Sequence, residues 1–299
     1  VVTDEQHRFG VEQRNRLINK GRRPDVLVMT ATPIPRTLAL YVYSDLDISV
    51  IDKLPPGRKP VKTEFYNGGD RMMAYDLALD EIRKGRQVYI VCPLIEEDEK
   101  LSLNSVEKLY DELKDGVFRG INIEILHGKM KPKEKDEIIN RFKRDETKVI
   151  ISTTVIEVGV NVPNASVMII ENAERFGLAQ LHQLRGRVGR GQYESYCILT
   201  GNAKTDTTKR RMEIMTESTD GFYISEQDLK LRGSGELFGL KQSGDEGFVL
   251  ANLYDDIKIL RCAREEGKML LESKDPNKVK LCRDIAYSLE RWSKYICFN

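Results

Sequence analysis

Short runs of β-branched apolar residues alternate with amphipathic segments of helical period from residue 1 to about residue 200. This alternation is typical of an α/β protein whose parallel sheet is covered by helices on both faces. The first apolar run resembles the end of a buried strand, so we expect the sequence to be the later part of a longer protein. The apolar runs predict strands at Val1–Thr3, Val26–Met29, Ile48–Ile51, Lys62–Tyr66, Gln87–Cys92, Asn122–Leu126, Lys148–Ser152, Val167–Glu171 and Glu194–Leu199.

Amphipathic helices are predicted between these strands. One carries Val106 and Leu113 on one face, and Asn104 with Glu107 three residues later resembles a capping box at its start. A second helix is predicted from Pro132 to Arg144, because proline is favoured in the first turn of a helix. Both helices have the length needed to cover a strand of the sheet.

The clearest break in the pattern is the segment from Leu54 to Pro60, which holds three prolines and one glycine. Proline lacks a backbone N–H and fixes φ, so this segment predicts a domain boundary rather than a helix or a central strand. After residue 205 the strands stop, and the sequence predicts helices, one of which has Leu253, Ile257, Leu260 and Leu271 on one face. We therefore expect domains at residues 1–56, 57–205 and 206–299.

Composition narrows the possible functions. The chain has 299 residues with 48 basic and 47 acidic side chains, so its net charge of +1 does not indicate a globally basic nucleic-acid binder. Its apolar runs are far shorter than the roughly 18 to 20 residues that span a bilayer, which excludes a membrane protein. The five cysteines are scattered, which favours free thiols in the cytoplasm over disulfides or a zinc site. Locally, residues 175–211 hold eight basic and only two acidic side chains.

Two adjacent carboxylates, Asp4 and Glu5, follow the first predicted strand. Ligands of open α/β sheets bind beyond the carboxyl ends of strands, so Asp4 would hold Mg²⁺ through water and Glu5 would orient and deprotonate an attacking water molecule. The hydroxyl groups of Thr30 and Thr32 follow another strand and can bond a neighbouring carboxylate. Taken alone, a solvated carboxylate pair and a plain turn explain these residues at least as well.

Arginines separated by glycines follow a helical stretch, in the sequence QLRGRVGRG from Gln183 to Gly191. Glycine adds no bulk, so this segment can approach phosphate closely, and each guanidinium offers a planar fork that suits phosphoryl oxygens. Arg187 and Arg190 would then stabilise charge that develops on a γ-phosphate. A generic RNA-binding loop or a solvated basic loop is the alternative.

Four stretches resemble motifs II, III, V and VI of superfamily 2 helicases in order and spacing: DEQH from Asp4, TATP from Thr30, ISTTVIEVGVNVP from Ile151 and QLRGRVGR from Gln183. Longer stretches, including DEQHRFGV and, from Asp228, DLKLRGSGELFGLKQSG, resemble the RecG family of bacterial DNA helicases. The last of these is similar to a translocation motif shared with the transcription-repair coupling factors called Mfd. Mfd proteins usually read DEEQRFG at the first stretch, so the RecG family is the closer match.

The resemblance implies roles for individual residues. The implied catalytic residues are Asp4, which also binds the metal, Glu5, Gln183, Arg187 and Arg190. Residues implied to contact the nucleotide or sense its state are Gln6, His7, Gly159 and Asn161. Residues implied to couple the nucleotide to movement on DNA are Thr30, Thr32, Arg232 and Gln242. Ser234 and Lys241 replace the proline and arginine that are frequent in relatives, which loosens a turn and removes a bidentate fork.

The resemblance also implies a fold and an activity. The fold would be RecA-like parallel sheets covered by helices, with a partial first lobe, a complete second lobe and a mainly helical C-terminal module. With ATP and Mg²⁺ as cofactors, the activity would be that of a double-stranded DNA helicase that remodels stalled replication forks and Holliday junctions in recombination and repair. The expected protein is a cytoplasmic monomer that binds branched duplex DNA, and single-stranded-DNA-binding protein is a further candidate partner.

The sequence contains no G-x-x-x-x-G-K-[ST] loop, which would cradle nucleotide phosphates. His127-Gly128-Lys129 has only the Gly-Lys pair, and its helicase interpretation is a loop that contacts the DNA backbone, with a solvated turn as the alternative. We expect the isolated chain to bind ATP poorly and to be inactive, and a preceding segment to supply the phosphate loop and a DNA-wedge domain. An Mfd-like translocase and a non-catalytic nucleic-acid-binding module are the competing interpretations.

Overall fold

The computed structural model describes residues 1–4, 24–31, 47–51, 53, 58–93, 99–153, 162–232 and 257–293. The chain divides into two compact units, one formed by residues 1–48 with 229–299 and the other by residues 49–228. The domain boundaries expected from the sequence, after residues 56 and 205, stay predictions.

The first unit contains a small parallel sheet of two strands, β1 (Val2–Thr3) and β2 (Leu27–Val28), in which Thr3 is paired with Val28. Both strands were predicted, and each is shorter than its apolar run. The strand predicted at Ile48–Ile51 is wrong, because residues 47–51 have no strand conformation. Ile51 is 90% exposed, and a β-branched run forms a strand only where a neighbouring strand or core covers it.

The second unit is built on a six-stranded sheet in which every neighbouring pair is parallel, with the order β3-β8-β7-β4-β6-β5. This confirms the predicted class of fold, and each strand lies within two residues of its predicted bounds. The strands are β3 (Val61–Asn67), β4 (Gln87–Cys92), β5 (Ile123–Leu126), β6 (Val149–Thr153), β7 (Ala165–Ile170) and β8 (Ser195–Gly201).

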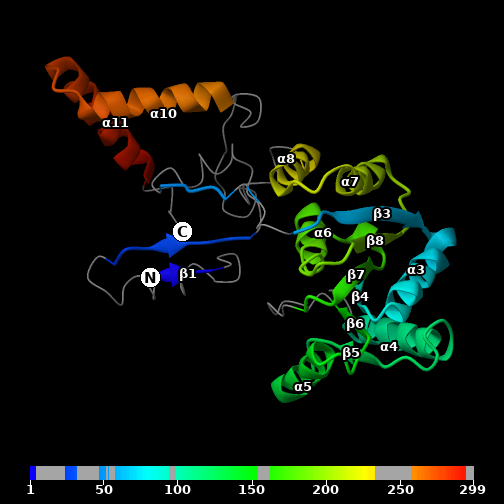
Figure 1. Cartoon of the computed structure of the whole chain (residues 1–299). Helices are drawn as coiled ribbons and strands as arrows, with labels where there is room; N and C mark the ends of the chain where they lie inside the picture. The colour runs from blue at the N-terminus through cyan, green and yellow to red at the C-terminus, as the bar shows by residue number, and fades with distance from the viewer. Residues whose placement is uncertain are drawn as a thin grey trace. The chain divides into compact units, whose positions relative to one another are not determined.

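Helices α3 (Arg71–Arg83) and α4 (Glu99–Asp115) cover one face of this sheet (Figure 1). The capping box predicted at Asn104 is wrong, because α4 begins at Glu99 and Asn104 lies inside it. Alternate residues of the central strands point at these helices, as expected of a strand with period 2. The core on this face contains Tyr75, Ala78, Ile82, Val88, Ile90, Val106, Leu113, Val149, Ile151, Val167, Ile169 and Ile198.

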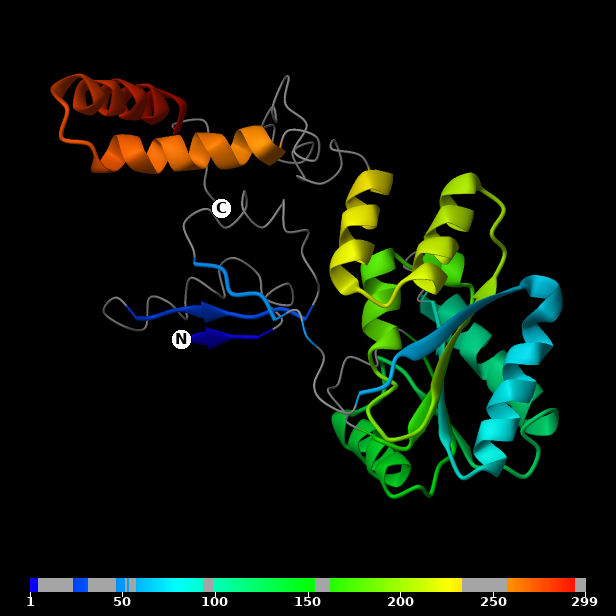
Figure 2. The same cartoon turned by 45° about the horizontal axis from the view of Figure 1, so that its top comes forward.

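The opposite face is covered by α5 (Pro132–Lys143), α6 (Leu178–Arg185) and α7 (Asp206–Glu217), and α7 packs beside α6 (Figures 1 and 2). Helix α5 begins at the predicted proline and ends one residue before the predicted end. Its Phe142 ring packs on Tyr89 of β4, with ring centroids 4.9 Å apart. The side-chain amide of Gln87 donates to the carbonyl oxygens of Phe142 and Thr147, so both backbone groups are satisfied inside the protein.

After residue 205 the described part of the chain forms helices joined by short connections and contains no strand, as predicted. Helix α8 (Gly221–Arg232) follows α7, and α10 (Ile257–Glu272) packs against α11 (Pro276–Ser293). Leu253 of the predicted apolar face lies outside the described residues. Within the described part of the chain, no helix has both the length and the apolar character needed to cross a bilayer.

Candidate functional site

The arginine-glycine loop lies between the end of α6 and the start of β8, at the amino ends of the parallel strands. Gly189 has φ +76°, and a Cβ added there would press on the Val61 side chain. A Cβ added to Gly191 would collide with the carbonyl oxygen of Pro163. The glycines are therefore required by packing against the rest of the sheet, whereas the sequence had suggested only an approach to phosphate. Close packing against Val61 on one side and Pro163 on the other fixes the path of the loop.

This loop brings Arg187 and Arg190 together beside Tyr89 of β4. Burial raises the pKa of the Tyr89 hydroxyl to about 12, and the charges of Arg187 and Arg190 act in the opposite direction. Arg190 is exposed, and its Nε donates to the carbonyl oxygen of Gly186 at 3.3 Å. Gln183 lies half-buried on α6. The two guanidinium groups that are predicted to act together thus lie in one region of the second unit. We call this region, formed by Arg187 and Arg190 beside Tyr89, the arginine corner.

Arg58, which lies outside the recognised motifs, reaches the same corner. Its Nη2 donates to the Gly186 carbonyl oxygen at 3.1 Å, across a separation of 128 residues in the chain. Burial, followed by the charge of Arg190, lowers the pKa of Arg58. The only signal in the sequence for a role of Arg58 is its positive charge. Arg58 lies in the proline-rich segment, and the prolines of that segment predict a domain boundary.

Arg185 belongs to the same motif but faces the interior, where it is 3% exposed. Its guanidinium donates to the carbonyl oxygens of Met215 at 2.9 Å and Ser218 at 2.8 Å, at the end of α7. It also lies 3.1 Å from Nδ1 of His182. Arg185 therefore connects the helix that carries the arginine loop to the helices that follow it in sequence.

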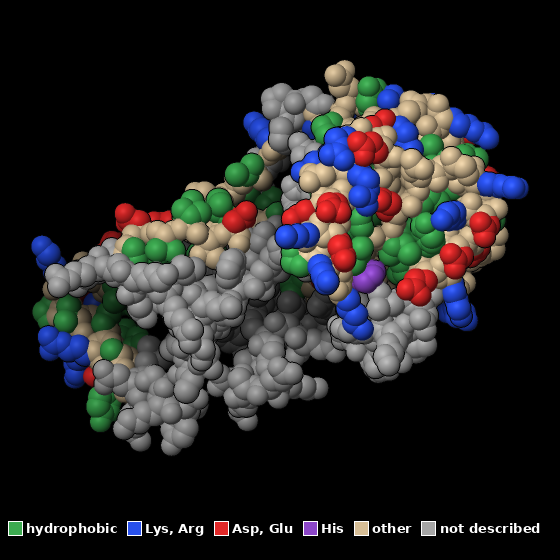
Figure 3. Space-filling view, turned by 90° about the horizontal axis from the view of Figure 1, so that it is seen from below, with side chains coloured by type: hydrophobic (Ala, Val, Ile, Leu, Met, Phe, Trp, Pro, Cys, Tyr) green, Lys and Arg blue, Asp and Glu red, His purple; other side chains and the backbone are tan. Residues whose placement is uncertain are grey.

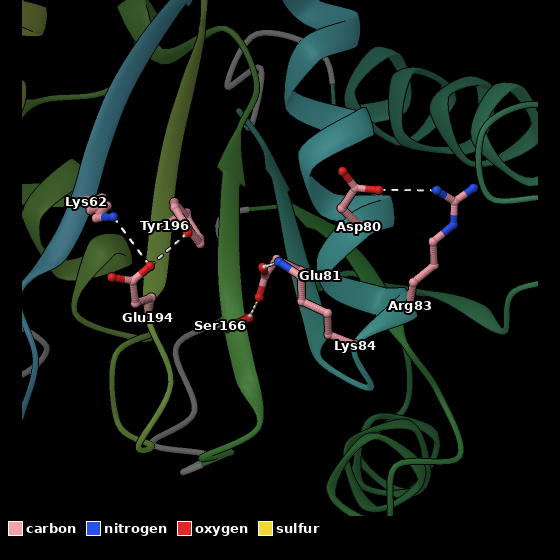
Figure 4. Close-up of polar contacts among 8 residues, drawn as sticks. All are labelled: Lys62, Asp80, Glu81, Arg83, Lys84, Ser166, Glu194 and Tyr196. Atoms are coloured by element: carbon pink, nitrogen blue, oxygen red, sulfur yellow. Dashed lines mark hydrogen bonds and ion pairs between the residues drawn. The ribbon is translucent and has the colours of Figure 1, made fainter.

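Two groups of charged side chains at the amino edge of the sheet are paired internally. Figure 4 shows Lys62 and Tyr196 directed at the Glu194 carboxylate, with distances of 3.3 and 3.2 Å. Glu81 accepts from Lys84 at 2.7 Å and from Ser166 at 3.4 Å. In each pair the basic side chain is neutralised by its acidic partner. The surface around Glu81 and Glu194 therefore lacks the concentrated positive charge of the arginine corner.

The carboxyl edge of the same sheet presents polar groups from β5 and β6. Leu126 is paired with Ser152, so the residues that follow these strands leave the sheet side by side. Among the described residues, His127 Nδ1, Ser152 Oγ and Thr153 Oγ1 are buried without a hydrogen-bond partner. Burial lowers the pKa of His127, which favours the neutral imidazole. A buried polar atom that has no partner among the described residues can form a hydrogen bond with a group outside them.

A buried carboxylate lies at the end of β7 on this edge. Glu171 is 5% exposed and accepts from Arg71 Nε at 3.0 Å and from the Tyr75 hydroxyl at 2.5 Å. Both oxygens of the carboxylate are therefore satisfied by helix α3. We regard this cluster as a structural anchor between α3 and the sheet.

In the first unit, Asp4 directly follows β1 and Thr30 follows the neighbouring parallel strand β2. Both residues thus lie beyond the carboxyl edge of the small sheet, where the sequence predicted a magnesium site. An exposed carboxylate suits Mg²⁺, which binds through one or two carboxylates and otherwise through water and phosphate. Within the described residues, no group of three or more potential metal ligands is gathered.

Several predicted site residues lie outside the described residues, namely Glu5, Gln6, His7, Thr32, Gly159, Asn161 and Gln242. The substituted positions Ser234 and Lys241 are also outside them. Arg232 is the last residue of α8. The roles of all these residues stay predictions.

Two family models match the chain. Residues 71–192 match the helicase conserved C-terminal domain, and residues 218–289 match the C-terminal part of domain 3 of ATP-dependent DNA helicase RecG. The first match contains the sheet from β4 to β7 together with the arginine loop. The second begins at the Ser218 carbonyl that Arg185 contacts.

Curated relatives match almost the whole chain. It is 53% identical to the ATP-dependent DNA helicase RecG of Synechocystis sp. over 93% of its length, and 52% identical to that of Bacillus subtilis over 91%. These alignments span 33% and 40% of the two relatives, so the chain covers well under half of their length. A solved structure of RecG bound to a three-way DNA junction is 46% identical, with a TM-score of 0.67, and covers 87% of this chain and 33% of that one.

Proposed function

Over the portion of those proteins that it spans, this chain belongs to the RecG family of helicases, and from that premise we propose that the whole protein is an ATP-driven motor on double-stranded DNA. The observation that carries this proposal is the arginine corner, in which close packing of Gly189 and Gly191 fixes a loop that presents Arg187 and Arg190. A rigid loop holds its charges in place before the reaction begins, which is what stabilisation of developing negative charge requires.

The proposed reaction is hydrolysis of ATP by the intact protein. Arg187 and Arg190 would stabilise the charge that develops on the γ-phosphate, and Glu5 would orient and deprotonate the attacking water. Mg²⁺, held through Asp4, would neutralise phosphate charge when bound. Gln6, His7, Gly159 and Asn161 would contact the nucleotide or sense its state, with Gln183 in the same motif as the arginines. The sequence of this chain lacks a phosphate-cradling loop, so we propose that the isolated chain is inactive.

The proposed substrate is branched duplex DNA, such as stalled forks and Holliday junctions. In this proposal the exposed turn at Gly128 and Lys129, which follows β5 at the carboxyl edge of the sheet, contacts the sugar-phosphate backbone. Thr30, Thr32, Arg232 and Gln242 would couple nucleotide state to movement. A cytoplasmic monomer, a role in recombination and repair, and an association with single-stranded-DNA-binding protein are parts of the same proposal.

The test is Arg190→Ala in the intact helicase, with Arg144→Ala as the matched control. Arg144 is an exposed arginine of the same unit that pairs with Glu146, away from the arginine loop. We expect DNA-stimulated ATP hydrolysis to fall by about 10³-fold or more in Arg190→Ala, the scale of an arginine finger, and to be unchanged in the control. Wild-type hydrolysis by Arg190→Ala would refute the motor and favour a non-catalytic module.

A further inference from the structure

Arg58 and Arg190 converge on a single acceptor. The guanidinium of Arg58 donates to the Gly186 carbonyl oxygen at 3.1 Å, and Arg190 donates to the same oxygen at 3.3 Å. Arg58 lies three residues before the start of β3, whereas Arg190 lies before β8, and these two strands are neighbours in the sheet. The pairing of β3 with β8 therefore holds the two guanidinium groups close together.

The contact leaves positive charge that the described residues do not neutralise. Within the described part of the chain, no carboxylate forms an ion pair with either Arg58 or Arg190, in contrast to the Lys62–Glu194 pair nearby. The half-buried Arg58 and the exposed Arg190 carry like charges that repel each other, and the lowered pKa of Arg58 reflects burial and the charge of Arg190. An anion bound between the two groups would relieve this repulsion.

A guanidinium is well suited to hold such an anion while it keeps its contact with Gly186. Arginine carries five N–H donors, and among the described residues the Arg58 guanidinium has one hydrogen-bond partner, the Gly186 carbonyl oxygen. The remaining donors form the planar fork that recognises phosphoryl oxygens. Because both side chains donate to the same carbonyl oxygen, their guanidinium groups are held close together. The two groups can therefore bind one phosphate group at the same time.

We propose that Arg58 is a further phosphate-binding residue, which acts with Arg190 on the same anionic group of a bound nucleotide. This inference rests on the proposed function and extends its site to a segment outside the recognised motifs. The competing role is purely structural, in which Arg58 only anchors the residues before β3 to Gly186. The two roles differ in whether the positive charge or the hydrogen bond is essential.

Two variants separate these roles. Arg58→Lys keeps the charge, and Arg58→Gln keeps an N–H donor for Gly186 without the charge. The first measurement is calorimetric binding of pyrophosphate to the intact helicase at low salt, with Lys59→Ala as the control, because Lys59 is the exposed cation next in sequence. We expect Arg58→Gln to bind about 10- to 100-fold more weakly than wild type, the range of one charged hydrogen bond. Arg58→Lys should lose less affinity and Lys59→Ala none. Equal affinities for Arg58→Lys and Arg58→Gln would overturn the proposal.

The second measurement is the kcat/KM for ATP of the intact helicase. We expect Arg58→Gln to lower it about 10- to 100-fold, and the double variant Arg58→Gln with Arg190→Ala to lose no more than Arg190→Ala alone, since both residues grip one group. If the fold-loss in kcat/KM of the double variant equals the product of the two single losses, Arg58 and Arg190 do not bind the same phosphate group, and the proposal is overturned. An inactive Arg190→Ala beside a fully active Arg58→Gln would defeat this inference and leave the proposed function standing. Full activity in both single variants would defeat the proposed function itself.

Discussion

His182 and Arg185 are one turn apart on α6, and their contact fixes the protonation state of the histidine. The guanidinium can only donate, so His182 Nδ1 must accept at 3.1 Å and the ring is neutral. Burial, and then the charge of Arg185, lower the pKa of His182 from its ordinary value of 6.5 to about 4. The imidazole therefore serves as an uncharged acceptor that helps to hold the Arg185 side chain.

This pair predicts a pH dependence of stability. Between pH 6.5 and pH 4 the unfolded histidine binds a proton that the folded one does not, so protonation favours unfolding. We expect the contribution of His182 to the free energy of unfolding to be complete above pH 6.5 and to be lost as the pH drops through this window, by at most about 1.4 kcal/mol per pH unit.

The measurement is urea unfolding of wild type and His182→Gln at a series of pH values. Glutamine can still accept from Arg185 but cannot titrate. The difference in stability between the two proteins should change between pH 6.5 and 4 and be constant above pH 7. A difference that is constant throughout would show that His182 titrates alike in the folded and unfolded chains.

At the scale of elements, two arginines join α7 to the rest of the second unit from opposite directions. Arg185 reaches from α6 to the carbonyl groups at the end of α7. Arg211 reaches from α7 to the carbonyl oxygens of Phe176 at 2.9 Å and Glu174 at 3.1 Å, just before α6. These hydrogen bonds connect backbone to guanidinium, so they depend little on the identity of the partner residue. We infer that α6 and α7 move as one body.

Removing one of these connections should loosen α7 selectively. Arg211→Ala loses both hydrogen bonds, and a bond to a charged group contributes about 1.5 to 3 kcal/mol. We expect amide hydrogen exchange within residues 206–217 to become about 10- to 100-fold faster, while β4, β6 and β7 stay protected. The control is Arg210→Ala on the same helix, because Arg210 forms an exposed ion pair with Glu213, and such pairs contribute little. Equal acceleration in both variants would contradict the anchoring role of Arg211.

At the scale of the whole molecule, charge is balanced overall and concentrated only locally. The chain has a net charge of +1, and on the face shown in Figure 3 lysine and arginine side chains are interspersed with acidic ones. Binding to DNA by such a protein depends on phosphate contacts at particular positions rather than on a general attraction.

Together with the proposed function, these properties predict how the intact protein would bind DNA. Its affinity for a three-way junction should fall about tenfold or more between 50 and 200 mM salt, the drop expected from two or more phosphate contacts. Junctions of equal shape and unrelated base sequence should bind with about the same affinity, because contacts to phosphate carry no sequence information. Fluorescence anisotropy titrations of two such junctions at both salt concentrations provide the check. An affinity that is insensitive to salt, or that depends strongly on base sequence, would contradict a backbone-directed motor.

The sequence by itself determined the class of fold and most of its elements. Buried strands such as Gln87–Cys92 are continuous apolar runs, and Pro132 marks the start of its helix, because these signals depend only on neighbours in the chain. The motif residues also identified the family. The strand predicted at Ile48–Ile51 failed because strand formation depends on a partner that a local pattern does not reveal.

Only the tertiary structure decided which side chains meet. The arginine loop precedes β8 and therefore lies at the amino ends of the parallel strands, whereas Asp4 follows β1 and lies at its carboxyl end. The pairing of β3 with β8 brings Arg58 to Gly186 across 128 residues of chain. Helical geometry turns Arg185 into the interior while Arg190 stays exposed. Contacts between residues that are distant in sequence follow from the topology of the sheet, which no local periodicity specifies.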